Sequence, residues 1–132
     1  FSGVGSFGIE CLSRGVNKVT FIENYSGVLP ILKKNLINLK SITNYEILEK
    51  NIYNENPFLN VSNKFDIIFL DPPYKDKNLF KILKKIEDNK ILNENGVIIF
   101  HRHKNEKDIF PSNFKISEEK KYGISKIIFL TT

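Results

Sequence analysis

The sequence has 132 residues, of which 41% are hydrophobic and 27% charged, and its formal net charge is +5. This composition excludes a disordered chain and fits one globular domain, and runs such as 67–70 are too short to span a membrane. The one cysteine, Cys11, excludes an internal disulfide, and no Cys/His cluster has zinc spacing, so we expect no metal and a reducing, cytoplasmic compartment. The positive charge suits a polyanionic partner without establishing one.

The chain opens on a glycine-rich stretch, FSGVGSFG, in which Gly3, Gly5 and Gly8 have G-x-G-x-x-G spacing. Such a loop normally follows a strand and opens a helix, and residues 7–13 have helical character, with Gly15 placed to end the helix. Only two residues precede the first glycine, and the sequence contains no methionine. We therefore expect an upstream portion, including the first strand of the sheet, to be missing from this sequence.

Strands and helices alternate along the rest of the chain. Apolar residues with helical period predict helices at 28–39, with Ser26 as N-cap, and at 79–86. Alternating or continuous apolar residues predict strands at 18–23, 45–48, 65–70, 96–100, 115–118 and 125–130. The strand 65–70 has the pattern of one buried on both faces, and residues 51–63 suggest a short helix and a loop. The order predicts an α/β fold with a mostly parallel sheet, helices on both faces and an antiparallel C-terminal hairpin turning at Tyr122-Gly123.

The glycine loop and Glu23 form the first set of residues that carries chemistry. Glycines allow a tight turn and close backbone approach, and the helix that follows offers free N–H groups. Glu23 ends the next strand, where its carboxylate could accept both hydroxyls of a ribose. The alternative is an ordinary strand-to-helix turn with a solvated glutamate. With the acid at this distance, nucleoside binding is favoured.

Asp71-Pro72-Pro73-Tyr74, directly after the strand 65–70, is the second set. The amine of a nucleobase is a poor nucleophile because its lone pair is delocalised into the ring. The Asp71 carboxylate and the Pro72 carbonyl could each accept one of its N–H groups, and Tyr74 could stack on the base. The alternative is a Pro-Pro turn that closes a strand. The preceding strand and the upstream glycine loop favour the chemical interpretation.

Four stretches together resemble one family: F-x-G-x-G-x-x-G, L-S-R-G, V-x-F-I-E and F-D-I-I-F-L-D-P-P-Y. They are similar to the bacterial RsmD family, S-adenosylmethionine-dependent methyltransferases that modify the exocyclic N2 of a guanine in 16S ribosomal RNA. The resemblance runs over essentially the whole chain and implies a Rossmann-like class I methyltransferase domain over residues 1–132. It also implies that the first strand and an RNA-binding segment lie upstream.

The resemblance implies roles for particular residues. The catalytic loop would be Asp71, Pro72, Pro73 and Tyr74. The cofactor would contact Ser2, Gly3, Gly5, Glu23, Asn24, Asn51, Ile52 and Asp71. Asn51 stands where the family usually has an aspartate that reads the adenine amine, and its side-chain oxygen could still accept that hydrogen bond. His101 stands where members often carry glutamate.

Basic residues at two further places could meet nucleic acid. Residues 101–104 (His-Arg-His-Lys) follow a predicted strand, and we expect a solvated loop there rather than a phosphate contact. Lys75 and Lys77 follow the second motif and could approach the RNA backbone.

The sequence therefore predicts methyl transfer from S-adenosylmethionine to a guanine N2 in small-subunit ribosomal RNA, either free or in an assembling particle. We expect the protein to be a monomer that does not associate with a membrane. The nearest alternative is the same chemistry on adenine N6 of DNA or RNA. An NAD-dependent oxidoreductase would share the glycine loop but leave 71–74 unexplained. A non-catalytic RNA-binding domain is a third alternative.

Overall fold

A computed structural model describes residues 1–59 and 61–132. The chain divides into two compact units, Phe1–Pro57 and Phe58–Thr132, and each is described by itself. Within the described residues, no helix is long and apolar enough to cross a bilayer. The expected short helix within 51–63 is replaced by turns in the described part of that range, and residue 60 lies outside the described residues.

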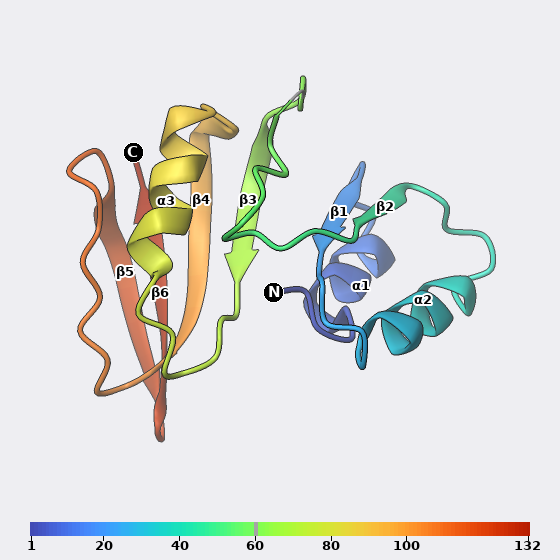
Figure 1. The fold of residues 1–132 in the computed structure, drawn as a ribbon, viewed down its shortest axis with the longest axis horizontal. Coiled ribbons are helices and arrows are strands. Elements are labelled where there is room, and N and C mark those ends of the chain that lie inside the picture. The colour runs from blue at the N-terminus through green and yellow to red at the C-terminus, as the bar shows by residue number, and fades with distance from the viewer. Residues whose placement is uncertain (60) are drawn as a thin grey trace. The chain divides into compact units, whose positions relative to one another are not determined.

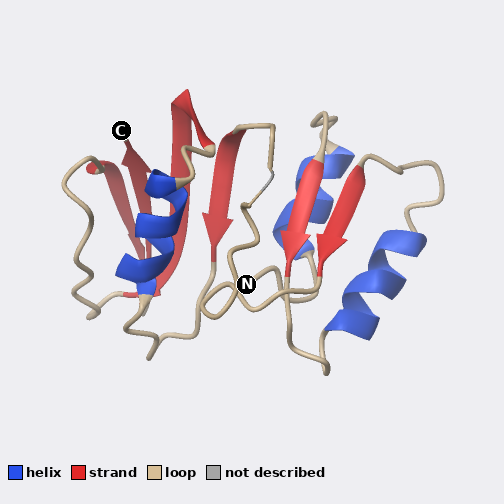
Figure 2. Cartoon of the chain, turned by 45° about the horizontal axis from the view of Figure 1, so that its top comes forward, coloured by secondary structure: helices blue, strands red, loops and turns tan. Residues whose placement is uncertain are grey.

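The first unit contains a two-stranded parallel sheet and two helices (Figures 1 and 2). Its elements are α1 (Ser6–Ser13), β1 (Val19–Ile22), α2 (Leu29–Ile37) and β2 (Tyr45–Leu48). β1 and β2 pair in register from Val19 with Tyr45 to Ile22 with Leu48. The core lies between the sheet and the helices and consists of Leu12, Phe21, Leu29, Leu32 and Leu36.

Local sequence accounts for the ends of both helices. Gly5, with a φ of 89°, precedes α1, and Gly15, with a φ of 84°, follows its C-terminal end. Both are left-handed conformations that glycine adopts at little cost. The second helix begins at Leu29 behind Val28, with Pro30 in its first turn, so the prediction of Ser26 as N-cap was wrong. Proline is tolerated there because a first-turn N–H has no partner within the helix.

The second unit contains a four-stranded sheet in the order β3-β4-β6-β5. The elements are β3 (Phe65–Leu70), α3 (Leu79–Asp88), β4 (Leu92–His103), β5 (Lys115–Tyr122) and β6 (Ser125–Thr131). β3 and β4 are parallel, whereas β6 is antiparallel to both β4 and β5. The buried face of α3 contributes Leu79, Ile82, Leu83 and Ile86, and Figure 1 shows this helix in front of the sheet and running roughly along its strands.

The α/β order, the parallel pairs and the C-terminal hairpin are as predicted. Two details differ from the sequence prediction. The described strands form two sheets instead of one, because among the described residues β1 pairs only with β2 and β3 only with β4. β3 is also not buried throughout, since Ile67 remains 47% exposed.

The strand β4 is longer than the sequence predicted. We expected this strand at 96–100, but it continues to His103, and Phe100 to His103 pair with Ile128 to Ser125 of β6. Three of the four residues in the predicted basic loop therefore belong to a strand. Their side chains alternate between its two faces.

Gly8 sets the distance between α1 and β1. A Cβ atom built there would lie 2.4 Å from Cε1 of Phe21 and 3.0 Å from Cγ1 of Val19. We expect Gly8→Val to lower the free energy of unfolding by about 1–3 kcal/mol because it overpacks this contact. Chemical denaturation measures the change. Glu10→Val, at an exposed position of the same helix, should change it by less than about 0.5 kcal/mol, and equal effects would contradict the packing argument.

Candidate functional site

The glycine loop is a closed turn in the first unit. The Gly5 N–H donates to the Ser2 carbonyl at 2.9 Å, and Gly3 and Gly5 have φ values of 54° and 89°. A Cβ at Gly5 would lie 2.5 Å from Cδ1 of Leu32, whereas one at Gly3 would meet no atom within 4 Å. Gly5 is therefore required for packing and conformation. Gly3 is required for conformation, and its open side leaves room for a ligand.

Glu23 joins this loop to the end of β1. One carboxylate oxygen, Oε2, accepts from the Gly3 N–H at 2.9 Å, and the other, Oε1, accepts from the N–H groups of Asn24 and Tyr25 at 2.9 and 3.0 Å. Burial raises the pKa of Glu23, but the three backbone donors outweigh it and hold the pKa below its ordinary value. The predicted ribose-binding acid thus also fastens the glycine loop.

Two oxygen atoms of the loop region retain hydrogen-bonding capacity. Oε2 of Glu23 accepts one bond from the protein and can accept another. The hydroxyl of Ser2 is buried and has no partner among the described residues. Buried polar atoms are normally satisfied, so an unpartnered one beside an open glycine is an observation that fits a polar ligand. Gly3 and Glu23 are in direct contact and Ser2 precedes Gly3, and their binding of a cofactor remains a prediction.

Asn51 has a structural role that the sequence did not reveal. Its Oδ1 accepts from the N–H groups of Tyr53 at 2.9 Å and Asn54 at 3.3 Å, and so closes the turn after β2. The expected contact between this oxygen and an adenine amine remains a prediction, and the turn already engages the atom that would make it. Ile52 is buried in the same turn, with 7% of its surface exposed.

The Asp71–Tyr74 loop follows the last residue of β3 in the second unit. Pro72 is fully buried, while Asp71 and Tyr74 are exposed. The carbonyl of Pro73 accepts from the Asp76 N–H at 2.8 Å, whereas that of Pro72 accepts no hydrogen bond from residues 1–59 or 61–132. The roles of the Asp71 carboxylate and the Pro72 carbonyl as acceptors for an amine remain predictions.

His101 contacts the first residue of this loop. Its Nδ1 lies 2.9 Å from Oδ1 of Asp71. Its ring packs edge to face against Tyr74, with centroids 5.8 Å apart, and His103 does the same at 5.7 Å. The Tyr74 hydroxyl is hydrogen bonded to Oγ of Ser125 at 3.2 Å. The two histidines, two positions apart on β4, therefore orient both side chains of the predicted catalytic loop.

Arg102 holds the loop through its backbone. Its side chain is 1% exposed, and it donates from Nη1 to the Pro73 carbonyl at 3.2 Å and from Nη2 to the Asp76 carbonyl at 2.8 Å. Nε and Nη2 also bind the Asp108 carboxylate at 3.1 and 2.9 Å, and the side chain of Asp108 is 7% exposed. Glu106 lies 3.7 Å away. Arg102 is therefore a buried cation held by several hydrogen bonds, and not a surface charge.

The expectation of a solvated loop at 101–104 was therefore wrong for its first three residues. The prediction ended the strand where the apolar run 97–100 ends. Polar residues can continue a buried strand when internal partners satisfy their hydrogen bonds, and these partners are not visible in the sequence. One signal was available in the sequence. His101 and His103 alternate with Arg102, and acids follow at Glu106 and Asp108. That pattern is compatible with a strand and a nearby ion pair.

The predicted residues lie in two places. The glycine loop, Glu23, Asn24 and the turn 51–52 belong to the first unit, and residues 71–74 belong to the second. Asp71 as a cofactor contact remains a prediction.

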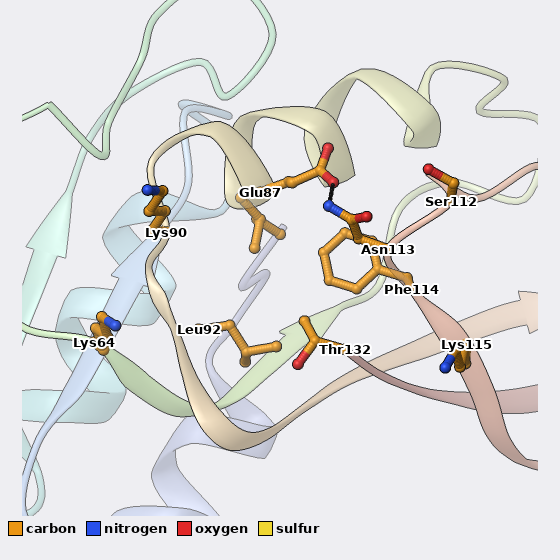
Figure 3. A pocket seen from close by; sticks show the side chains of 10 residues that line it. Lys64, Glu87, Lys90, Leu92, Ser112, Asn113, Phe114, Lys115 and Thr132 are labelled. Carbon is orange, nitrogen blue, oxygen red and sulfur yellow. Dashed lines mark hydrogen bonds between the residues drawn. The ribbon is translucent and has the colours of Figure 1, made fainter.

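The second unit also contains an open groove of about 680 Å³, drawn in Figure 3. Glu87 and Asn113 are hydrogen bonded at its wall. Its lining includes Lys64, Leu92 and Lys115, which lie at or next to the starts of strands. The Asp71–Tyr74 loop lies where β3 ends. None of the predicted site residues lines this groove.

The fold is that of the class I methyltransferases, and a solved putative methylase from Haemophilus influenzae aligns over 98% of this chain and 81% of its own, with a TM-score of 0.82 and 33% identity. A solved ribosomal protein L11 methylase from Lactobacillus delbrueckii aligns over 98% of this chain and 65% of its own, with a TM-score of 0.74, and at 17% identity it bears on the fold alone. A conserved hypothetical protein from Streptococcus pyogenes aligns over 100% of this chain and 82% of its own, with a TM-score of 0.86 and 25% identity.

The family follows from the sequence comparisons. The model of the family described as Conserved hypothetical protein 95 matches residues 1–131, and the chain belongs to that family, as the RsmD resemblance predicted. Two relatives named ribosomal RNA small subunit methyltransferase D come from Haemophilus influenzae (34% identity over 94% of this chain) and Buchnera aphidicola (36% over 92%). The chain spans 65% and 61% of the lengths of these relatives.

Glu23 should make stability depend on pH. Because its pKa is lowered in the folded state, its contribution is present above the pKa of an unfolded glutamate and is lost as the pH falls through the folded pKa. We expect Glu23→Gln to reduce stability at neutral pH and to flatten the acid side of the stability profile. Denaturant unfolding at a series of pH values measures both. Glu94→Gln, at an exposed position of β4, is the control, and an unchanged acid limb in Glu23→Gln would refute the assignment.

Arg102 should dominate the stability of the second unit. We expect Arg102→Met to lower the free energy of unfolding by about 3–5 kcal/mol, because it leaves the Asp108 carboxylate buried without its partner. Adding Asp108→Asn should recover part of the loss, since the orphaned charge is then removed. Thermal and denaturant unfolding measure these changes. Arg14→Met, at a side chain 77% exposed, should cost less than about 1 kcal/mol, and a similarly small cost at Arg102 would show that the network is not stabilising.

Proposed function

We propose that this protein transfers a methyl group from S-adenosylmethionine to the exocyclic N2 of a guanine in small-subunit ribosomal RNA. The observation that carries the proposal is the Asp71–Tyr74 loop. It presents an exposed carboxylate and an unoccupied carbonyl at the end of a parallel strand, and three successive β4 side chains hold it. Family membership and the names of the relatives, ribosomal RNA small subunit methyltransferase D, support methyl transfer to ribosomal RNA.

The first unit would hold the methyl donor. The open side of Gly3 would face it, Oε2 of Glu23 would accept a ribose hydroxyl, and the unpartnered hydroxyl of Ser2 would reach its polar part. Gly5, Asn24 and the turn 51–52 would complete the contacts. When bound, S-adenosylmethionine supplies a methyl group already activated by its sulfonium. Glu23 has one free acceptor site on Oε2, so we infer one strong ribose contact there unless Gly3 releases it.

The Asp71–Tyr74 loop would hold the amine that is methylated. Asp71 and the Pro72 carbonyl would each accept one N–H of the guanine amine, and this would turn its lone pair toward the donor. The Tyr74 ring, fixed by His101, His103 and Ser125, would stack on the base. The protein's contribution is mainly position, because the methyl carbon is already electrophilic. The Asp71 carboxylate can accept the proton that the amine loses once the new C–N bond forms.

His101 would act on Asp71 and not on the substrate. Its Nδ1 fixes one carboxylate oxygen at 2.9 Å and leaves the second oxygen for the amine. This assigns a positioning role to a residue at which the chain differs from the family pattern.

The rest of the domain prediction is retained as part of the proposal. The N–H groups of Phe1 and Ser2 donate to the Ile22 carbonyl at 2.9 and 3.2 Å, on the edge of β1 that β2 does not use. We infer that a strand entering the glycine loop would pair with that edge.

The remaining parts of the proposal are that the protein is a monomer and that it acts in the cytoplasm, on free ribosomal RNA or on an assembling small subunit.

Transfer of labelled methyl groups from S-adenosylmethionine tests the proposal. The substrates are small-subunit ribosomal RNA, the small ribosomal particle and duplex DNA. We expect RNA methylation at a guanine N2, located by nucleoside mass spectrometry. Asp71→Ala combined with Tyr74→Ala should lower kcat/KM by at least about 100-fold, since the amine loses both its acceptor and its stacking partner.

Asp88→Ala combined with Tyr122→Ala removes the same residue types at exposed positions of the same unit and should leave transfer unchanged. Near-normal transfer by the Asp71 and Tyr74 variant would contradict the proposed mechanism. Methylation of adenine in DNA, with none in RNA, would replace the proposed substrate.

A further inference from the structure

The loops that leave the C-terminal ends of β3 and β4 carry four exposed lysines, which we call the loop-lysine surface: Lys75, Lys77, Lys104 and Lys107. We propose that this surface binds the phosphodiester backbone of the RNA on either side of the base held by the Asp71–Tyr74 loop. The inference rests on the proposed function, because it names how the RNA is held at that same site.

The buried guanidinium of Arg102 brings the two loops together. Its Nη2 donates to the Asp76 carbonyl at 2.8 Å and to Oδ1 of Asp108 at 2.9 Å. Asp76 lies between Lys75 and Lys77 in the first loop, and Asp108 follows Lys107 in the second. In Figure 1, both loops leave the same end of the sheet. The two loops that carry the lysines therefore lie side by side, at the end of the sheet that carries the predicted catalytic loop.

The carboxylates of this region are directed toward internal donors. Asp108 and Glu106 face Arg102, at 2.9 and 3.7 Å from its Nη2. Asp76 accepts from the Asn78 N–H at 2.7 Å, and Asp71 contacts His101. Each acid near the loop lysines thus has an internal partner, so little of the nearby negative charge is directed at their ammonium groups.

The lysines themselves are left without acidic partners. Among the residues that the structure describes, none of the four forms an ion pair. The exposed lysines of the C-terminal hairpin differ, because Lys120 pairs with Glu118 at 3.2 Å and Lys121 with Glu119 at 3.6 Å. The four loop lysines therefore differ from these two hairpin lysines in having no acidic partner, which makes the hairpin pair a matched control.

Phosphate oxygens are the anions that such a surface fits. Flexible lysines bind phosphates as point charges without reading sequence, and such contacts set the register and orientation of a nucleic acid. Here they would orient the RNA so that one base reaches Tyr74, which is 38% exposed. The surface would thus supply affinity, and the Asp71–Tyr74 loop would supply chemical selectivity.

Equilibrium binding of a fluorescent fragment of small-subunit ribosomal RNA, measured over a range of salt concentrations, tests the proposal. The test variants are Lys75→Gln with Lys77→Gln, and Lys104→Gln with Lys107→Gln. We expect each to weaken binding and to reduce the slope of log K against log salt by about 1.4–1.8, because two phosphates are no longer neutralised and each accounts for about 0.7–0.9 of the slope. Lys120→Gln with Lys121→Gln changes the net charge equally and should alter the slope much less.

The outcomes separate this proposal from the proposed function. An equal loss of slope in the hairpin control would show that net charge alone matters, and unchanged slopes in the test variants would show that RNA does not touch these lysines. Either result overturns the inference, as does absence of RNA binding by the unmodified protein. Methyl transfer by the unmodified protein is measured separately. Its absence, with the expected binding differences intact, would contradict the proposed function and leave the surface standing.

Discussion

The arrangement of the second unit depends on the ion pair between Arg102 and Asp108. Removing two charges from water is costly, and the pair is maintained because each charged group also has hydrogen-bonding partners. Arg102 uses its remaining N–H groups on two loop carbonyls. The energy of one desolvated cation is thereby coupled to the conformation of the loop that carries Asp71 and Tyr74. A loop fixed in this way loses little further conformational entropy when a base binds.

The first unit uses a charge of the opposite sign in a similar way. Its glycine loop contains backbone N–H groups, and Glu23 accepts from one of them and from two more at the end of β1. Both predicted functional loops are thus tied by an ionised side chain to backbone polar groups. The two loops share this feature because a loop rich in glycine or proline has few side chains that could stabilise its conformation, so a side chain from outside the loop does so.

Patterns with a local cause could be predicted from the sequence. Apolar period gives α3 and the strands 45–48 and 65–70, and the left-handed glycines account for the turns around α1. The D-P-P-Y motif could be placed because it directly follows a recognisable strand. In the candidate site, the sequence placed Glu23 at the end of the strand that follows the glycine loop, but it did not predict that the Glu23 carboxylate accepts a hydrogen bond from the Gly3 N–H.

Contacts between distant residues could not be predicted in this way. The separation between Asp71 and His101 is thirty residues, and only the parallel register of β3 and β4 makes them neighbours. Arg102 looked like part of a solvated basic loop because composition alone does not show that Asp108 is buried with it. The division into two sheets was also missed, since strand pattern does not specify pairing partners.

Asn51 and His101 are the two positions at which this sequence departs from the pattern that the family resemblance implies. At Asn51 the amide oxygen closes a backbone turn, which a carboxylate oxygen would do equally well, and what differs is the second atom of the side chain, a donor in place of an acceptor. At His101 a donor stands beside Asp71, where a glutamate would place a second carboxylate against the first. At Asn51 either residue satisfies the backbone turn, so the difference falls on what the side chain offers a ligand, whereas at His101 the difference falls on the group that contacts Asp71. Tests of this chain's own chemistry are therefore best directed at these two positions.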